Sequence, residues 1–204
     1  MIVKVCGMTQ AENIRAVEAV GIDWMGFIFH PRSPRCLTTV PDYLPTGCKR
    51  VGVFVNESME GIREKARCLA LDILQLHGSE SPELCHRLKQ QGFCIVKALP
   101  IQEEADLNVA ERYGPEECDY LLFDTKSPNH GGSGRAFNWN ILQAYAGSLP
   151  FLLSGGLSPS CLPALKAFRH PLMAGIDLNS GFELAPGIKD AKSLKQFVAQ
   201  LNHE

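Results

Sequence analysis

Tyr120-Leu121-Leu122-Phe123-Asp124-Thr125-Lys126 is an apolar run that ends in a carboxylate, and the glycine cluster Gly131-Gly132-Ser133-Gly134 follows after a short polar connection. Such a run is typical of a buried strand that places one acid, Asp124, at its end. Glycines lack a Cβ atom, so the backbone N–H groups of the cluster can surround an anion such as phosphate. The alternative is an ordinary strand end before a flexible loop. Because several other apolar runs end in the same way, we favour a site for sugar-phosphate chemistry.

The composition is that of a soluble globular protein. Its 204 residues are 45% hydrophobic and 21% charged, so we expect one core and a single domain over residues 1–204. The formal net charge of −2 and the absence of a basic cluster argue against nucleic acid or an anionic membrane as partner. The chain shows neither a secretory signal pattern nor an apolar run of transmembrane length, which predicts a cytoplasmic location. We expect a monomer rather than a dimer.

The cysteines do not form a recognisable metal or disulfide pattern. Eight are present, without a C-x-x-C pair and without zinc-ligand spacing to the six histidines. We therefore predict reduced thiols and no metal site.

Short apolar or β-branched runs alternate with mostly helical patterns along the chain. The predicted strands are Ile2–Cys6, Trp24–Phe29, Val51–Val55, Ile73–Leu76, Cys94–Ala98, Tyr120–Asp124, Phe151–Ser154 and Met173–Leu178. The predicted helices are Gln10–Val20, Ser58–Ala70, Ser81–Gln91, Gln102–Tyr113, Asn138–Ala146, Pro159–Arg169 and Lys189–Leu201. Ser58 and Ser81 are expected to cap their helices. Pro41 and Pro45 interrupt the connection from residue 36 to 49, where we expect one helical turn at most.

Strict alternation of strands and helices predicts a parallel sheet with right-handed crossovers. Eight such units predict an α/β fold, a single closed (β/α)8 barrel (TIM barrel) with a degenerate second helix. A doubly wound open sheet is the competing architecture, but neither G-x-G-x-x-G nor G-x-x-x-x-G-K-[ST] occurs. In a barrel the carboxyl-terminal strand ends form the active face. Those ends carry Cys6-Gly7, His30 to Arg35, Asn56, Gln75 to Gly78, Lys97, Asp124 to Lys126, Ser154 to Gly156 and Asp177 to Gly181.

Several spaced motifs in this chain resemble those of one enzyme family. They are Lys4–Thr9, Gly26–Arg35, Val51–Asn56, Gln75–Gly78, Asp124–Trp139, Leu153–Leu157 and Asp177–Asp190, which together span nearly the whole chain. In this order they are similar to the phosphoribosylanthranilate isomerase family of tryptophan biosynthesis. Met8 and Ile188 differ from the residues usual at these motif positions in the family, and the second helix is shortened.

The resemblance implies an Amadori rearrangement of N-(5-phospho-β-D-ribosyl)anthranilate to 1-(2-carboxyphenylamino)-1-deoxy-D-ribulose 5-phosphate. It also implies that Asp124 is the general acid and Cys6 the general base. An aspartate with a pKa of about 3.9 and a thiol with a pKa of about 8.5 are both in the wrong protonation state at neutral pH. We therefore expect burial or the nearby Asp177 to raise the pKa of Asp124, and a cation or helix N-terminus to stabilise the Cys6 thiolate. A buried structural cysteine is the alternative.

The remaining roles follow the charges of the implied substrate. Arg35 resembles the family's ligand for the anthranilate carboxylate, with Arg32 as a solvated neighbour, and Asp177 would hold a ribose hydroxyl or orient the intermediate. Gln75 and His77 would line the mouth, His77 as a hydrogen-bonded wall residue. The expected phosphate ligands come from the loops after the last three strands. They are Gly132, Ser133, Gly134, Gly155, Gly156, Asn179, Ser180 and Gly181. The expected partner is a small phosphoribosyl molecule, and the reaction needs no cofactor.

Strand alternation adds a hypothesis about Lys4. If Cys6 points into the barrel, Lys4 points inward one layer below, and a buried lysine needs a partner. We expect Lys4 to pair with Asp124 or Asp177. The alternative is a buried stem with its ammonium group on a carbonyl oxygen or water.

Two other functions remain open at this point. The histidine-pathway aminoaldose isomerase performs the same rearrangement in a similar barrel, but it typically has aspartate where this chain has Cys6. A non-catalytic barrel that binds phosphoribosyl ligands could keep the glycines while losing Cys6 or Asp124, and here all are present.

Overall fold

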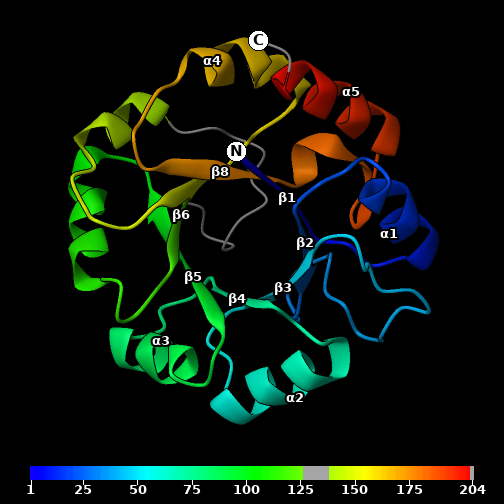
Figure 1. Cartoon of the computed structure of the whole chain (residues 1–204), viewed down its shortest axis with the longest axis horizontal. Helices are drawn as coiled ribbons and strands as arrows, with labels where there is room; N and C mark the ends of the chain where they lie inside the picture. Colours follow the sequence, from blue (N-terminus) through cyan, green and yellow to red (C-terminus); the bar gives the residue numbers. More distant parts are fainter. Residues whose placement is uncertain (126–137, 203–204) are drawn as a thin grey trace.

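The computed structural model describes residues 1–125 and 138–202, and its central feature is a closed barrel of parallel strands. Each strand pairs with the next along the chain, and the last pairs with the first. The strands are β1 (Ile2–Cys6), β2 (Trp24–Ile28), β3 (Lys49–Phe54), β4 (Ile73–Leu76), β5 (Cys94–Ile101), β6 (Tyr120–Thr125), β7 (Phe151–Leu153) and β8 (Met173–Leu178). The predicted (β/α)8 barrel is confirmed, and Figure 1 shows its strands surrounded by the helices.

Helical segments form the outer layer of the barrel. They are α1 (Ala11–Glu18), α2 (Met59–Leu69), α3 (Pro82–Lys89), η1 (Glu104–Arg112), η2 (Trp139–Ala144), η3 (Pro159–Cys161), α4 (Leu162–Ala167) and α5 (Ala191–Asn202). The η segments are 3₁₀-helices, a distinction that apolar periodicity did not make. Ser58 and Ser81 cap α2 and α3 as predicted, since their Oγ atoms accept hydrogen bonds from the N–H groups of Gly61 and Leu84. In the described part of the chain, every helix is too short or too polar to span a lipid bilayer.

The connection between β2 and β3 contains no helix, as its prolines predicted. It passes beside the end of β2, where Cys36 forms an isolated parallel bridge with Ile28. The Leu37 N–H donates to the Ile28 carbonyl oxygen at 2.7 Å. Arg35 directly precedes Cys36 and therefore lies at the carboxyl-terminal end of the barrel.

Alternation along the strands produces two apolar layers. Every second strand residue points into the lumen, and the residues between them pack under the helices. The lumen cluster consists of Cys6, Trp24, Val51, Val53, Ile73, Val96, Ala98, Leu122 and Leu152. Strands buried on both faces explain why the sequence shows continuous apolar runs instead of an alternating pattern.

Three aspartates make the same contact at the amino-terminal ends of the strands. Asp23, Asp72 and Asp119 directly precede β2, β4 and β6, and each carboxylate accepts a 2.8 Å hydrogen bond from a backbone N–H in the preceding strand. The N–H donors belong to Val3, Arg50 and Ile95. The backbone N–H of each aspartate also donates to the carbonyl oxygen of the residue whose N–H its side chain accepts. These paired bonds hold neighbouring strands in register at the end remote from the polar strand ends.

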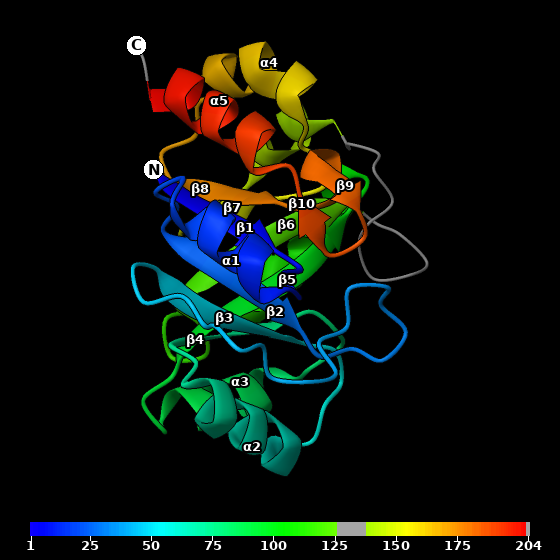
Figure 2. The same ribbon diagram turned by 90° about the vertical axis from the view of Figure 1, so that its right-hand side faces the viewer.

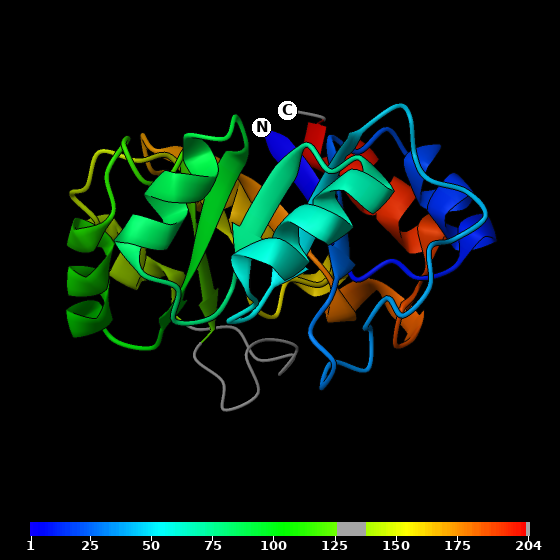
Figure 3. The same cartoon turned by 90° about the horizontal axis from the view of Figure 1, so that it is seen from below.

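An additional hairpin that the sequence did not predict lies at the carboxyl-terminal end of the barrel. After the turn η4 (Ser180–Phe182), β9 (Glu183–Ala185) pairs antiparallel with β10 (Ile188–Lys189). The prediction that Lys189 begins the last helix was wrong, because its backbone N–H and carbonyl groups bond the side chain of Asn13. Figure 2 shows this hairpin on the side opposite the N-terminus, and Figure 3 shows the blue loop after β2 also opposite the N-terminus.

Candidate active site

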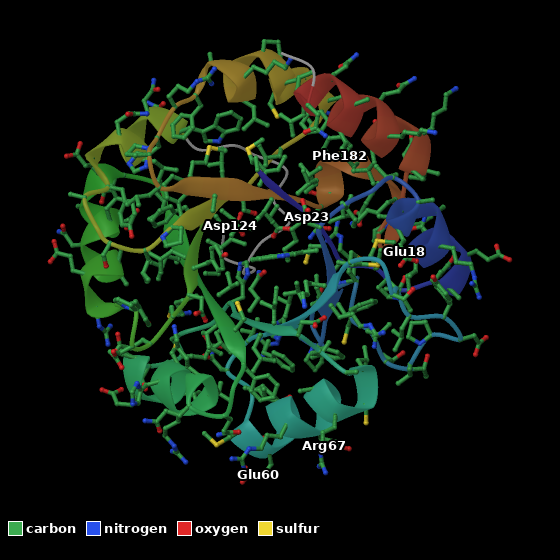
Figure 4. All side chains as sticks on the ribbon, viewed as in Figure 1. Glu18, Asp23, Glu60, Arg67, Asp124 and Phe182 are labelled. Atoms are coloured by element: carbon green, nitrogen blue, oxygen red, sulfur yellow. The ribbon has the colours of Figure 1, made fainter. Side chains whose placement is uncertain are left out.

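Cys6 and Asp124 point into the same lumen at the carboxyl-terminal ends of their strands. Cys6 belongs to the lumen cluster, and Asp124 follows the lumen residue Leu122 by two positions on β6. Both side chains are buried, with residue exposures of 3% and 7%. In Figure 4, Asp124 lies inside the ring of helices, whereas Glu60 lies on the outside of α2.

Lys4 and Asp177 form a buried ion pair beneath Cys6. They are register partners on β1 and β8, and the Lys4 Nζ donates to the Asp177 Oδ1 at 2.8 Å. The expected lysine–carboxylate pair is therefore confirmed, with Asp177 as the partner. Burial alone would lower the pKa of Lys4, but the charge of Asp177 raises it above its ordinary value. The pKa of Asp177 is raised because burial outweighs the opposing effect of Lys4.

The Cys6 thiol has a cation beside it, as expected, but its environment still favours the protonated form. Burial raises the pKa of Cys6, and the charge of Lys4 opposes this only in part. Gly26, the register partner of Cys6 on β2, makes the room for the sulfur. A Cβ atom on Gly26 would lie 2.7 Å from the Cys6 Sγ and 3.1 Å from its Cα.

Asp124 is bound by a short chain of polar groups across the lumen. Its Oδ2 lies 3.2 Å from the Nε2 of His77, and the Nδ1 of His77 lies 2.8 Å from the Gln75 Nε2. The Oδ1 of Asp124 accepts a hydrogen bond from the Thr125 N–H. The Gln75 Oε1 is buried without a partner among the described residues. His77 is therefore hydrogen-bonded, as expected, and it is in direct contact with Asp124.

Arg35 lies at this end of the barrel, and its guanidinium already contacts a carboxylate. The Arg35 Nε donates to Glu183 Oε1 at 2.8 Å, and the Nη2 donates to Oε2 at 2.6 Å. Arg32 is exposed, as expected of a solvated neighbour. The Arg35 side chain crosses Gly7, where a Cβ atom would lie 2.8 Å from its Cδ.

Glu183 and Lys189 form part of this cluster, although neither was among the predicted site residues. The Lys189 Nζ donates to Glu183 Oε1 at 2.5 Å and to Asn179 Oδ1 at 2.7 Å. Both residues lie within the Asp177–Asp190 motif, which is one of the motifs that resemble the family. Lys189 was expected to begin the last helix, and no role was predicted for Glu183.

The expected phosphate ligands divide into two groups. Gly132, Ser133 and Gly134 lie outside the described residues. Gly155 and Gly156 have φ values of 85° and 68°, a conformation that favours glycine. At Gly155 a Cβ atom would also lie 2.7 Å from the Thr125 nitrogen, next to Asp124.

The loops after β7 and β8 are in contact at the same end of the barrel. A Cβ atom on Gly181 would lie 2.0 Å from the Leu157 carbonyl oxygen, so this approach requires glycine. Ser180 begins the turn η4, and the side-chain oxygen of Asn179 is engaged by Lys189. The structure therefore brings Gly155, Gly156 and the Asn179–Gly181 segment to the end of the barrel where Asp124 lies.

A hollow of about 410 Å³ lies at the opposite end of the barrel, between the starts of β2, β3 and β4. Its acids, Asp23 and Asp72, already accept the strand N–H groups of the aspartate pattern described above. Barrels place catalytic groups at the other end, and residues here serve stability.

A closed barrel whose titratable groups gather at the carboxyl-terminal strand ends defines the class of (β/α)8-barrel enzymes. The model of the family described as N-(5'phosphoribosyl)anthranilate (PRA) isomerase matches residues 3–200. The chain belongs to this isomerase family.

Known relatives and solved structures agree with this assignment. The chain is 54% identical over 204 residues to the N-(5'-phosphoribosyl)anthranilate isomerase of Phocaeicola vulgatus, covering 100% of this chain and 99% of the relative. For that of Parabacteroides distasonis the identity is 49%, with 100% and 94% covered. The crystal structure of phosphoribosyl anthranilate isomerase from Thermus thermophilus superposes with a TM-score of 0.84 at 31% identity, covering 98% of both chains.

Proposed function

We propose that this chain converts N-(5-phospho-β-D-ribosyl)anthranilate to 1-(2-carboxyphenylamino)-1-deoxy-D-ribulose 5-phosphate in L-tryptophan biosynthesis. The observation that carries the proposal is the placement of Cys6 and Asp124 at the same end of one lumen, on strands far apart in sequence. A solved family structure in complex with the reduced 1-(o-carboxyphenylamino)-1-deoxyribulose 5-phosphate supports the ligand class; it superposes with a TM-score of 0.80 at 32% identity, covering 98% of both chains.

The rearrangement requires one acid and one base. Asp124 donates a proton to the ring oxygen of the ribose, which opens the furanose and leaves a Schiff base at C1. The Cys6 thiolate then removes the proton from C2, and the C2–H electrons move to give an enolamine. The enolamine becomes the ketone when C1 gains a proton and the C2 hydroxyl loses one, so atoms and charge balance. Each positioned acid or base of this kind contributes about 10²- to 10⁴-fold in rate.

The surrounding residues have roles that match the charges of the substrate. Arg35 binds the anthranilate carboxylate, and Asp177 holds a ribose hydroxyl while its pairing with Lys4 keeps a cation near Cys6. Gln75 and His77 orient Asp124 and line the mouth. The phosphate lies against Gly155, Gly156 and the Asn179–Gly181 segment, and we propose that Gly132, Ser133 and Gly134, which follow β6 in the sequence, also bind it.

The test is to generate the unstable anthranilate riboside in situ and follow the loss of its fluorescence. The wild-type protein should accelerate this loss, and Cys6→Ser and Asp124→Asn should each lower kcat by about 10²-fold or more. Matched controls are Cys68→Ser, at an exposed cysteine, and Asp42→Asn, at an exposed acid. A wild-type protein without activity contradicts the proposed function. Cys6 or Asp124 variants that keep full activity contradict only the acid and base roles.

The same assay set separates the two rival functions. The histidine-pathway aminoaldose isomerase would turn over its own substrate faster than the anthranilate riboside, and a binding module would turn over neither. Cys6 supports the tryptophan-pathway reaction, because the rival family typically places an aspartate there.

We further propose that the protein acts as a monomer on a small-molecule substrate. The barrel closes on itself, and its candidate site is assembled from one chain. The related isomerase of Thermotoga maritima is described as dimeric, with monomers generated from it. Analytical ultracentrifugation at assay concentrations distinguishes the two states.

A further inference from the structure

Arg35 presents one edge of its guanidinium to Glu183, and the hydrogen bonds to Glu183 do not use the other edge. The Nε donates to both carboxylate oxygens, at 2.8 and 3.0 Å, and Nη2 donates to Oε2 at 2.6 Å. This contact uses Nε–H and one N–H of Nη2. The N–H groups of Nη1 and the second N–H of Nη2 form a separate fork, which matches a second carboxylate.

Glu183 is itself held in place by two further hydrogen-bond donors. Its Oε1 accepts hydrogen bonds from the Lys189 Nζ at 2.5 Å and from the Gly187 N–H at 3.0 Å. Lys189 is anchored in turn by Asn179 and, through its backbone, by Asn13. The carboxylate is therefore fixed before any ligand arrives.

The charges of this cluster explain why the glutamate is needed. Lys189 is buried and Arg35 is partly buried, and the charge of Arg35 contributes to lowering the pKa of Lys189 after the larger effect of burial. Burial opposes ionisation of Glu183, but hydrogen bonds from Arg35 and Lys189 lower its pKa. With Glu183 ionised, the three side chains carry one positive charge in excess beside Cys6. An anionic ligand would neutralise this excess positive charge.

We propose that Glu183 is a positioning residue that locks the Arg35 guanidinium in the orientation that reads the aryl carboxylate of the substrate. The proposal rests on the proposed function. Glu183 thereby sets the preference for a carboxylated arylamine over an uncharged one. Without its charge, the neighbouring cations Arg35 and Lys189 repel each other, and Arg35 turns away from the position above Gly7.

The test compares two substrates that differ only in the carboxylate. The phosphoribosyl adducts of anthranilate and of aniline are formed in situ, and the rearranged products are measured by chromatography. Glu183→Gln should lower kcat/KM for the anthranilate adduct by about 10- to 100-fold, mainly through KM. It should change kcat/KM for the aniline adduct by no more than about threefold. Glu60→Gln on the outer face of α2 is the matched control and should change neither.

A double-mutant cycle tests whether Glu183 acts through Arg35. In an Arg35→Met background, Glu183→Gln should have an effect of no more than about twofold on the anthranilate adduct. Additive effects, equal losses on both substrates, or no loss on the anthranilate adduct overturn the inference while leaving the proposed function standing. A wild-type protein silent on the anthranilate adduct overturns the proposed function first.

Glu183→Asp covers the case in which Glu183→Gln does not fold. Aspartate keeps the negative charge, but its side chain is one methylene shorter, so the carboxylate lies farther from Arg35. The preference for the carboxylated substrate should therefore fall only in part. An unchanged preference overturns the inference.

Discussion

The Nζ of Lys4 lies 2.8 Å from the Oδ1 of Asp177, and both side chains are buried one layer below Cys6. The pair joins β1 to β8, where the barrel closes. It therefore has two consequences: it contributes to closure, and it supplies a cation to the thiol. Each consequence can be tested separately.

Lys4→Met should destabilise the protein because it leaves Asp177 buried without its partner. The expected loss in the free energy of unfolding is about 3–5 kcal/mol at neutral pH, measured by urea denaturation. Lys4→Met/Asp177→Leu should regain much of this, since the second change removes the uncompensated charge. Lys49→Met is the control, because its ion pair with Asp72 is exposed and should contribute no more than about 1 kcal/mol. A Lys4→Met protein as stable as the wild type would contradict the pairing.

The pH dependence of kcat/KM should report the raised pKa of Cys6 on its alkaline side. The active form needs a deprotonated thiol and a protonated carboxyl group, and a thiol ordinarily titrates above a carboxylic acid. The fraction of enzyme in this active form reaches a plateau at pH values below the pKa of the thiol. Above the pKa of the thiol, this fraction falls. Because burial raises the pKa of Cys6, the decline should begin at a higher pH than the pKa of an ordinary thiol. Lys4→Met removes the opposing charge, so it should lower the plateau and move the decline to higher pH. A decline near pH 7 in the wild type would contradict the assignment of Cys6.

Gly26→Ala should impair catalysis more than folding. The new methyl group would lie 2.7 Å from the Cys6 Sγ, so the thiol must move away from its position in the lumen. We expect kcat to fall by about 10- to 100-fold, with an overpacking cost of about 1–3 kcal/mol in the free energy of unfolding. Gly114→Ala is the matched control, because its Cβ atom would meet only the end of the Glu117 side chain, at 3.3 Å. Full activity in Gly26→Ala would show that the position of the sulfur is not critical.

Asp119→Ala should lower stability without changing catalysis. Asp119 accepts hydrogen bonds from the Ile95 N–H and the Lys89 Nζ, both at 2.8 Å, at the end of the barrel remote from the candidate site. Losing these bonds should cost about 1–3 kcal/mol in thermal or urea unfolding. Asp42→Ala, at an exposed acid, should be neutral. A change in kcat that exceeds the control would show that the two ends of the barrel are coupled.

The elements that the sequence predicted well are those with a strong local signal. The strand Tyr120–Thr125 and the serine caps of α2 and α3 follow from apolar runs and from side chains that bond the next turn. The 3₁₀ character of η1 and η2 has no such signal, because the spacing of apolar residues is similar in both helix types. The β9–β10 hairpin was missed because Lys189 also fits the start of an amphipathic helix.

The candidate site was predictable only in part, because only some of its residues have a local signal in the sequence. Cys6, Asp124 and Arg35 were found at strand ends and in loops after strands. The partners of these groups are distant in sequence, since Arg35 and Glu183 are separated by 148 residues and Lys4 and Asp177 by 173. Charge at one position does not reveal which opposite charge lies beside it in space.

The amino-acid sequence by itself determined the alternation of strands and helices, the barrel that follows from it, and the end of the barrel at which polar groups gather. These features depend on local apolar patterns and on the geometry of parallel strands. Only the tertiary structure decided that Lys4 pairs with Asp177, that Glu183 binds Arg35, and that burial keeps the Cys6 pKa raised. Desolvation and charge pairing depend on distances between groups from different strands, and those distances exist only once the barrel has closed.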